Sequence, residues 1–206
     1  MQNKHTRITT PIGVAKWPSL EKPDTKFDKD GCYKVDLIVQ GDEADALVKE
    51  MSTVRDAHIE TIKETKPKWK AKVSPLPVSD EVDDDENPTG AKVFKFKLKA
   101  VGINGEDRWE QRPIIMDSDG TPITKVPRIG GGSKLIVCAD IIPYLSPMVG
   151  AGVSLRLKAV QLIDLVEYSS SSANDWNFTP QKGFKVSDQE VETEEGVEIS
   201  EESADF

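Results

Sequence analysis

The alternation of hydrophobic and polar residues is clearest in residues 92–99, Lys-Val-Phe-Lys-Phe-Lys-Leu-Lys. Successive side chains of a strand point to opposite faces, so this segment predicts a half-buried strand with Phe94 and Phe96 in the core. Its lysines then line the open face about 6–7 Å apart, at ~3.3 Å per residue, comparable to the spacing of phosphates along a nucleic-acid strand. Taken alone, a strand whose lysines only provide solubility is the simpler interpretation.

Other segments show similar strand patterns, and one shows a helical pattern. Apolar residues spaced three or four apart predict an amphipathic helix over residues 42–66, with Asp42 as its N-cap. Asn104-Gly105 predicts a hairpin turn, and Pro-rich residues 143–147 predict a connecting loop. Proline and aspartate predict a mobile loop over residues 75–90. Further strands or extended segments are expected at residues 8–17, 33–39, 101–103, 109–116, 135–139 and 153–166.

These elements predict a mainly β fold, namely a five-stranded Greek-key barrel of the OB type with one long helix between early strands. The expected domain covers residues 1–168, followed by a linker at residues 169–186. Residues 187–206 form an acidic tail. The region after residue 168 has no apolar period, so we expect it to be disordered or attached only through Trp176, Phe178 and Phe184.

The net charge of −9 is unevenly distributed along the chain. Residues 187–206 hold nine of the 36 acidic residues and no Lys or Arg, and the remaining 27 acidic residues match the 27 Lys and Arg. The body is therefore neutral, and its charge does not argue against nucleic acid. The sequence has no apolar run of about 18 residues that would predict a membrane span, and the N-terminus does not resemble a secretory signal. Cys32 and Cys138 are expected to be reduced thiols.

The sequence gives little support for catalysis. His5 and His58 have no partner at metal-site spacing, and no cofactor is expected. Residues 130–134, Gly-Gly-Gly-Ser-Lys, lack the residue order of a phosphate-binding loop and predict a flexible turn. The run Asp83–Glu86 is most simply solvated surface, so a metal-dependent nuclease is the least favoured alternative.

Binding of single-stranded nucleic acid has more support, because each basic segment has an aromatic residue nearby. Unpaired bases stack on aromatic rings while cations bind the phosphates. Trp17 is expected in the core, whereas Trp69 and Trp109 are equally good candidates for core and for stacking positions. The candidate contacts are Lys66, Lys68, Trp69, Lys70, Lys72, Lys95, Lys97, Lys99, Trp109, Arg128, Lys134 and Tyr144.

The acidic tail is a second candidate for binding. A polyanion can imitate nucleic acid in a basic groove, and the ring and free carboxylate at its end suit a partner's apolar pocket with basic rims. A solubilising tail is the simpler alternative, although a terminal Phe adds nothing to solubility. The candidate partner-binding residues are Glu201, Glu202, Asp205 and Phe206.

Several segments together carry a resemblance to a known family: residues 33–37, 94–97, 126–135, 143–144 and 149–155, and the tail ending Asp205-Phe206. In this order they resemble the single-stranded DNA-binding proteins of T7-like short-tailed bacteriophages. Lys95 and Lys97 fall on the Phe-Lys-Phe-Lys motif, where the family's lysines contact DNA. This tail is less densely acidic than the family's usual one, Asp30 stands where a basic residue would help binding, and the first 30 residues show little similarity.

The resemblance implies a non-enzymatic OB-fold dimer. It also implies roles in phage DNA replication, recombination and annealing in the cytoplasm of the infected bacterial host. The tail would contact the phage DNA polymerase and the helicase-primase and would compete with DNA. The alternative from another class is a non-catalytic protein-interaction module whose tail acts as a DNA mimic, and it predicts no complex with single strands at low salt.

Overall fold

The structure is a computed structural model of the 206-residue chain and describes residues 5–66 and 72–167. The predictions for the linker, for the tail and for Lys68, Trp69 and Lys70 lie outside the described residues. The described chain is mainly β with one helix, α1 (Gly41–Thr65), as expected. Its strands are β1 (Thr6–Thr9), β2 (Gly13–Asp24), β3 (Cys32–Val39), β4 (Val78–Val82), β5 (Pro88–Lys99), β6 (Val101–Asn104), β7 (Asp107–Glu110), β8 (Ile114–Met116), β9 (Lys134–Ser146) and β10 (Gly150–Asp164).

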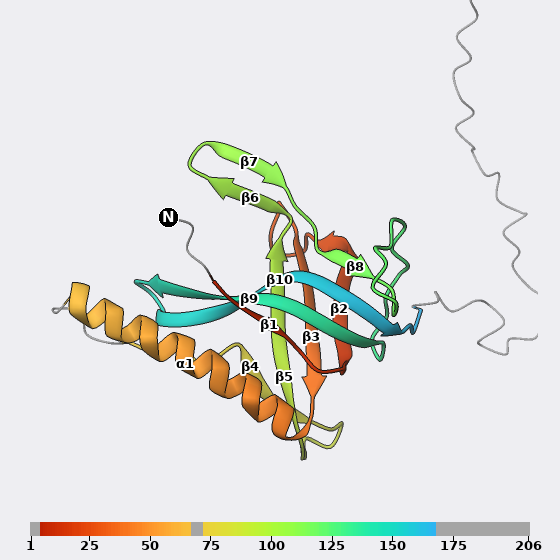
Figure 1. Ribbon diagram of the computed structural model, residues 1–206, viewed down its shortest axis with the longest axis horizontal. Helices are drawn as coiled ribbons and strands as arrows, with labels where there is room; N and C mark the ends of the chain where they lie inside the picture. Colours follow the sequence, from red (N-terminus) through yellow and green to blue (C-terminus); the bar gives the residue numbers. More distant parts are fainter. Residues whose placement is uncertain (1–4, 67–71, 168–206) are drawn as a thin grey trace, which may run out of the picture. The chain divides into compact units, whose positions relative to one another are not determined.

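Eight of the strands form one sheet, in the order β1, β9, β2, β3, β5, β10, β8 with β4 paired to β5, and β9 also pairs with β10 (Figure 1). β2, β3 and β5 are antiparallel neighbours, and β5 pairs with β10 in parallel. β10 pairs with β9 over most of its length, and β9 pairs with the start of β2. β1 adds to β9, β4 to β5 and β8 to β10. This arrangement leaves one face of each strand for a shared interior.

That interior contains the apolar faces predicted from the alternation. Phe94 and Phe96 are buried, and in the sheet they lie directly opposite Leu37 and Val35 of β3, which are also buried. Leu155 of β10 completes this layer across from Phe96. Because alternate residues of β5 fill the core, Lys95, Lys97 and Lys99 are exposed on the opposite face.

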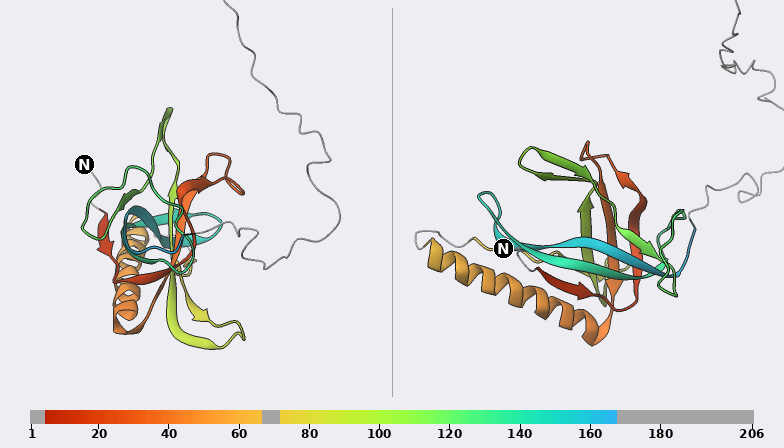
Figure 2. Two further views of the ribbon diagram at one scale, coloured as in Figure 1. Left: turned by 90° about the vertical axis from the view of Figure 1, so that its right-hand side faces the viewer. Right: turned by 45° about the horizontal axis from the view of Figure 1, so that its top comes forward.

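Helix α1 lies alongside β9 and β10 (Figures 1 and 2). Its bounds agree with the predicted range, and Leu47, Met51 and Ile62 lie on its buried face as predicted. The prediction of Asp42 as N-cap is wrong, because the chain enters the helix at Gln40, whose side chain makes no capping hydrogen bond. Asp42 instead lies in the first turn, where a negative charge favours the helix dipole. α1 is not apolar enough to cross a membrane, and the described residues contain no helix that is.

The predicted loop over residues 75–90 is wrong. Most of this segment belongs to the β4–β5 hairpin, and only residues 83–87 form the turn. There the Asp83 carboxylate accepts hydrogen bonds from the backbone N–H groups of Asp85 and Asn87. The turn residues are therefore concentrated at the hairpin tip. The β4–β5 and β6–β7 hairpins lie at opposite ends of β5 (Figure 2).

Two further predictions in the second half of the chain need correction. Residues 143–146 are not a loop but continue β9, where its pairing is with β10 alone, so a residue without an N–H is tolerated at position 143. The return strand expected over residues 109–116 is interrupted near Pro113. Its first part, in β7, pairs with β6 around the predicted Asn104-Gly105 turn, and its second part, β8, pairs with β10 instead.

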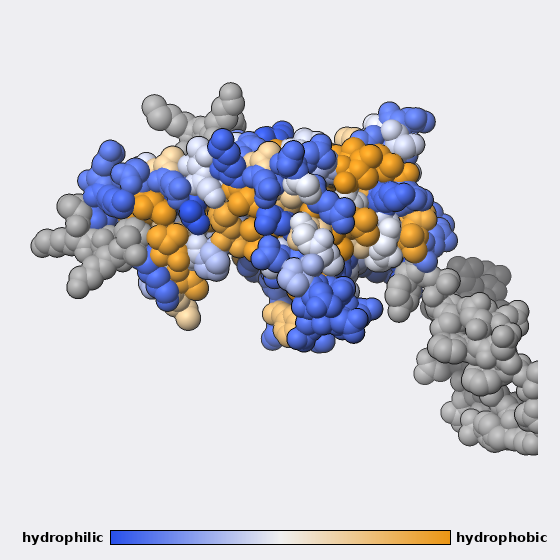
Figure 3. Space-filling model, turned by 90° about the horizontal axis from the view of Figure 1, so that it is seen from below, coloured by the Kyte–Doolittle hydropathy of each residue, from blue (hydrophilic) through white to orange (hydrophobic). Residues whose placement is uncertain are grey.

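The surface carries separate apolar patches among hydrophilic residues, as the view from below shows (Figure 3). Exposed apolar residues are common on folded proteins and need no individual explanation. The more informative exposed residues are the aromatic ones on strands or on loops next to cations.

Candidate nucleic-acid interface

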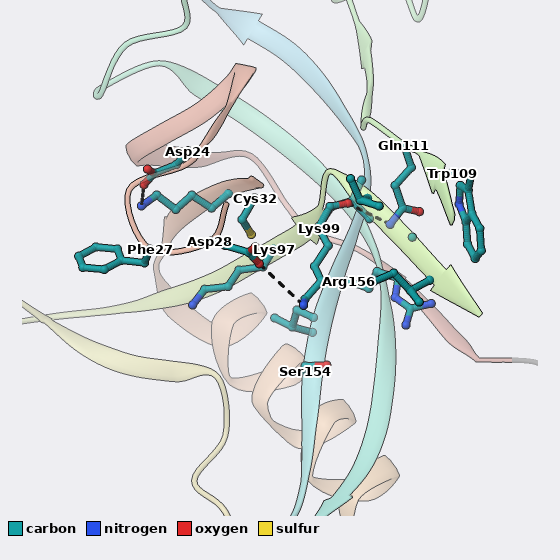
Figure 4. A pocket seen from close by; sticks show the side chains of 16 residues that line it. Asp24, Phe27, Asp28, Cys32, Lys97, Lys99, Trp109, Gln111, Ser154 and Arg156 are labelled. Atoms are coloured by element: carbon teal, nitrogen blue, oxygen red, sulfur yellow. Dashed lines mark hydrogen bonds and ion pairs between the residues drawn. The ribbon is translucent and has the colours of Figure 1, made fainter. Parts of the chain in front are cut away.

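A groove of about 760 Å³ opens on the outer face of the sheet. One wall is the loop between β2 and β3, residues 25–31, and the other is the β6–β7 hairpin (Figure 4). The floor comes from β3, β5 and β10. Three segments far apart in sequence therefore meet around one surface.

The floor of the groove has a row of cations that runs across the strands. Lys34 of β3 is directly opposite Lys97 of β5, and Lys97 is in turn opposite Arg156 of β10. Neighbouring strands are about 4.8 Å apart, so three positive charges occupy adjacent positions on one face. Like charges directly opposite one another destabilise a sheet. The row is therefore suited to a polyanion laid across the strands.

Counter-charges neutralise this row only in part. Lys34 forms an ion pair with Asp24, and Lys99, further along β5, lies 3.7 Å from a carboxylate oxygen of Asp28. The Lys34 ammonium group, with the backbone N–H of Lys26, holds the pKa of Asp24 below its usual value. Among the described residues, no carboxylate lies within 4.0 Å of the charged groups of Lys97 or Arg156. These two groups remain available for phosphates.

Phe27 projects from the β2–β3 loop and is 88% exposed. The Lys26 ammonium nitrogen lies 5.4 Å from the centre of its ring. The loop is held to the opposite wall by an ion pair between Arg108 of β7 and Asp30, with 2.8 Å between Nη2 and Oδ1. Asp30 thus has a structural role at the position where a basic residue had been expected to help binding.

Trp109 stands on the other wall and is 47% exposed. It pairs with Gly102 across the β6–β7 hairpin, and a Cβ added at Gly102 would collide with the indole ring. The ring therefore lies against the backbone of Gly102, and glycine is needed for this close approach. Gln111, whose side chain donates to the Lys99 carbonyl, fixes the end of the hairpin against β5. The result is an aromatic surface held in place at the side of the groove.

One carboxylate stands among the lysines next to the groove. Asp36 of β3 is directly opposite Lys95, and its other cross-strand neighbour is Lys16. Burial raises the pKa of Asp36 above its ordinary value, although the ammonium groups of Lys95, Lys97, Lys34 and Lys16 act in the opposite direction. When ionised, this group repels a phosphate that approaches Lys95, and it reduces the net positive charge of the surface.

The structure brings some of the predicted DNA-binding residues together at the groove. Lys97, Lys99 and Trp109 line the groove, and Lys95 lies on the same exposed face of β5. Of the two alternatives left open for Trp109, the core position is wrong, because the residue is 47% exposed. Their contacts with DNA stay a prediction.

Other predicted contacts lie away from the groove. Tyr144 is the cross-strand partner of Gly152 in the β9–β10 hairpin, where a Cβ on Gly152 would meet its ring. The side chain of Lys72 donates to the Met148 carbonyl on that hairpin. Lys66 is exposed at the end of α1, and the Lys134 ammonium nitrogen lies 3.4 Å from Asp164 Oδ2. Arg128 lines a separate hollow together with Trp17.

Sequence reasoning missed Phe27, Lys34 and Arg156. The strand alternation placed Arg156 on the polar face of its strand, between Leu155 and Leu157, but nothing in the sequence placed that strand beside β5. Phe27 had a local signal, a lone aromatic residue among charged residues of a turn.

The described residues contain no group of three or more His, Cys, Asp or Glu side chains placed to hold a metal ion. In the Asp83–Glu86 run, the Asp83 carboxylate is engaged in the hydrogen bonds of the hairpin turn. Cys32 and Cys138 are free thiols.

The mainly β fold and a cationic groove with a ring on either wall define an OB-like protein with a surface suited to unpaired nucleic acid. The family described as single-stranded DNA-binding protein, bacteriophage T7, matches residues 12–165. The chain belongs to this family, which confirms the resemblance found in its sequence motifs.

Individual relatives agree with this assignment. The chain is 30% identical over 185 residues to the single-stranded DNA-binding protein of Enterobacteria phage T3, a match that covers 82% of this chain and 80% of that protein. It is 29% identical over 186 residues to that of Escherichia phage T7, with the same two shares.

Solved structures show the same fold. The crystal structure of gp2.5, a single-stranded DNA-binding protein encoded by bacteriophage T7, matches with a TM-score of 0.64 and 27% identity over 88% of this chain and 98% of that chain. The single-stranded DNA-binding protein of bacteriophage Enc34, solved in complex with single-stranded DNA, matches with a TM-score of 0.52 and 20% identity. This match covers 78% of this chain and 88% of that chain.

Proposed function

We propose that this protein binds single-stranded DNA without sequence specificity, in the groove between the β2–β3 loop and the β6–β7 hairpin. The observation that carries the proposal is the combination of two exposed rings, Phe27 and Trp109, with the cations Lys97 and Arg156 between them. Membership of a family of single-stranded DNA-binding proteins supports the same function.

The chemistry of these side chains accounts for sequence tolerance. Every base has a π-face, so stacking on Phe27 and Trp109 does not depend on base identity. Lys97 and Arg156 attract phosphates, which are the same at every nucleotide. Duplex DNA keeps its bases stacked in the helix interior, where they cannot reach the rings. Single strands are therefore preferred over duplexes.

The wider role follows the family. The protein acts without catalysis in phage DNA replication, recombination and annealing, as a homodimer in the cytoplasm of the infected host. The ring of paired strands β9, β2, β3, β5 and β10 is a closed five-stranded OB barrel. Residues 187–206 compete with DNA for the groove, and their terminal Phe206 recruits the phage DNA polymerase and helicase-primase.

The test is a binding titration with fluorescently labelled oligo(dT) and a duplex of equal length. The full chain is expected to bind oligo(dT) more tightly than the duplex, with an affinity that falls steeply as salt rises, because phosphate contacts release counterions. Absence of a complex with oligo(dT) at low salt, for both the full chain and a chain lacking residues 187–206, would overturn the proposal. That result would favour the protein-interaction module instead.

The same titration tests the tail. A chain without residues 187–206 is expected to bind oligo(dT) more tightly at low salt, because a competing polyanion has been removed. The gain should shrink as salt screens the tail. Equal affinities of the two chains at low salt would show that the tail does not enter the groove.

A further inference from the structure

Trp17 of β2 was expected in the core, and this prediction is wrong, since the residue is 69% exposed. The regular pairing of β2 with β3 is interrupted between Lys16 and Ser19, so Trp17 and Pro18 lie in an irregular part of the strand. The interruption turns the indole outward, and a polar strand pattern gives no reason for a tryptophan there.

The backbone at Trp17 is strained. Its φ angle is 47°, in the left-handed region that bulky residues rarely adopt. Such conformations cost free energy and concentrate at functional sites. Glycine adopts this region readily, so an exposed tryptophan at the position is unfavourable for the folded backbone. A function of the indole side chain would explain why tryptophan occupies this strained position.

Cations lie next to the Trp17 ring. The ammonium nitrogen of Lys16 lies 4.9 Å from the ring centre, and it is held there by an ion pair with Glu81, 3.0 Å away. Trp17 also lines a hollow of about 940 Å³ together with Lys22 and Arg128.

The segment after Arg128 forms the other side of this hollow. Gly130 and Gly131 line it, and the next residues are held to β2 by two backbone hydrogen bonds. In these, the Gly132 N–H donates to the Ala15 carbonyl at 2.8 Å, and the Ala15 N–H donates to the Ser133 carbonyl at 2.8 Å. The Gly-rich segment thus keeps Arg128 beside the Trp17 bulge.

The hollow adjoins the groove described above. Ser19 lines the hollow, Lys34 lines the groove, and these two residues are direct cross-strand partners. Arg156 on β10 and Ser19 on β2 lie three strand spacings apart, about 14 Å at 4.8 Å each, and Trp17 lies two residues further along β2. This span accommodates about four nucleotides at the 3.4 Å spacing of a duplex strand, and fewer in an extended strand.

We propose that Trp17 is a third stacking surface for single-stranded DNA, and that the hollow it shares with Arg128 takes a nucleotide beyond the groove. The bound strand then crosses β10, β5, β3 and β2 in turn, with its phosphates near Arg156, Lys97 and Lys34. This inference rests on the proposed function and extends the proposed DNA-binding site from the groove to the hollow beside Trp17.

The test compares oligo(dT) of two or three nucleotides, which is shorter than the span from Arg156 to Trp17 and fills the groove alone, with one of about twelve, which also reaches Trp17. Trp17→Gly removes the ring and suits the left-handed backbone, so the melting temperature should not fall. Trp17→Phe keeps a smaller ring. Met148→Ala, at an 82% exposed apolar residue of the β9–β10 turn, is the matched control.

Trp17→Gly should weaken binding of the longer oligonucleotide by about fivefold or more, the lower end of the effect of a stacked base, and leave the shorter one unchanged. The affinity of Trp17→Phe for the longer oligonucleotide should lie between those of wild type and Trp17→Gly, and the affinity of Met148→Ala should match that of wild type. Unchanged binding of both lengths by Trp17→Gly would overturn the inference while the proposed function stands. An equal loss for both lengths would also overturn it, because the ring would then belong to the groove. A wild-type chain that binds neither length overturns the proposed function itself.

Discussion

The cationic row across β5 and β10 allows a quantitative prediction for a double substitution, Lys97→Ala with Arg156→Ala. Both side chains are exposed, and no carboxylate of the described residues lies within 4.0 Å of their charged groups. Their removal leaves no buried charge unpaired and relieves repulsion between neighbouring cations. The fold should therefore keep its wild-type melting temperature or exceed it.

The magnitude follows from counterion release. Each phosphate contact on a single strand contributes about 0.7 to the slope of log affinity against log salt, so two lost contacts reduce the slope by about 1.4. Between 50 and 200 mM salt, a fourfold change, the wild-type advantage should therefore shrink by about sevenfold.

The assay is fluorescence anisotropy with labelled oligo(dT) over this range of salt. A matched control, Lys49→Ala with Lys63→Ala on α1, changes the net charge equally but leaves the groove intact. The control should keep the wild-type slope. If the double substitution in the groove also kept it, the assignment of phosphate contacts to Lys97 and Arg156 would be refuted.

Four further predictions concern single side chains. Trp109→Ala should weaken oligo(dT) binding by about 1–3 kcal/mol, and unchanged anisotropy titrations would contradict its stacking role. Asp36→Asn should tighten binding by roughly threefold, the effect of about 0.6 kcal/mol from a removed negative charge ~7 Å from a phosphate in water, and weaker binding would contradict this. Phe96→Ala should lower the free energy of unfolding by about 3–5 kcal/mol in urea denaturation, and a loss under 1 kcal/mol would contradict its core position. Arg7 donates to the Asp140 carboxylate and holds the pKa of that group below its usual value. The stability from this pair is therefore fully present above about pH 4, and it is lost as the pH falls through the lowered pKa of Asp140 in the folded state. Arg7→Ala should therefore be less stable than wild type at pH 7, with a difference that shrinks toward about pH 2, and a constant difference in urea midpoints would exclude this linkage.

Local patterns in the sequence predicted the core well. The alternation in β5 placed Phe94 and Phe96 inside and the lysines outside, because a strand with one buried face leaves little choice of register. The three- and four-residue spacing likewise located α1. Both signals depend on neighbours a few residues apart, which the sequence shows directly.

Pairings between distant strands were not available from the sequence in the same way. The sequence put Lys95, Lys97 and Lys99 in a row along one strand, whereas the row on the groove floor runs across strands from Lys34 to Arg156. That row depends on the register of β5 with β3 and β10, which is set by the whole sheet.

The aromatic residues show a second limit. Trp17 lies at an irregularity in the pairing of β2 with β3, and the ring of Trp109 lies against Gly102 on the facing strand, while both residues stay exposed. Tyr144 lies on β9 rather than on the predicted loop, and Gly152 across the β9–β10 hairpin leaves room for its ring. Propensity alone does not decide between these outcomes.

The central claim is that unpaired bases lie between Phe27 and Trp109. Its most direct test is photo-crosslinking of the full chain to oligonucleotides that contain 5-iododeoxyuridine, with the crosslinked peptides identified by mass spectrometry. We expect crosslinks in the β2–β3 loop and the β6–β7 hairpin, at Phe27 and Trp109. Crosslinks confined to α1 or to the β9–β10 turn would place the DNA on another face and contradict the account.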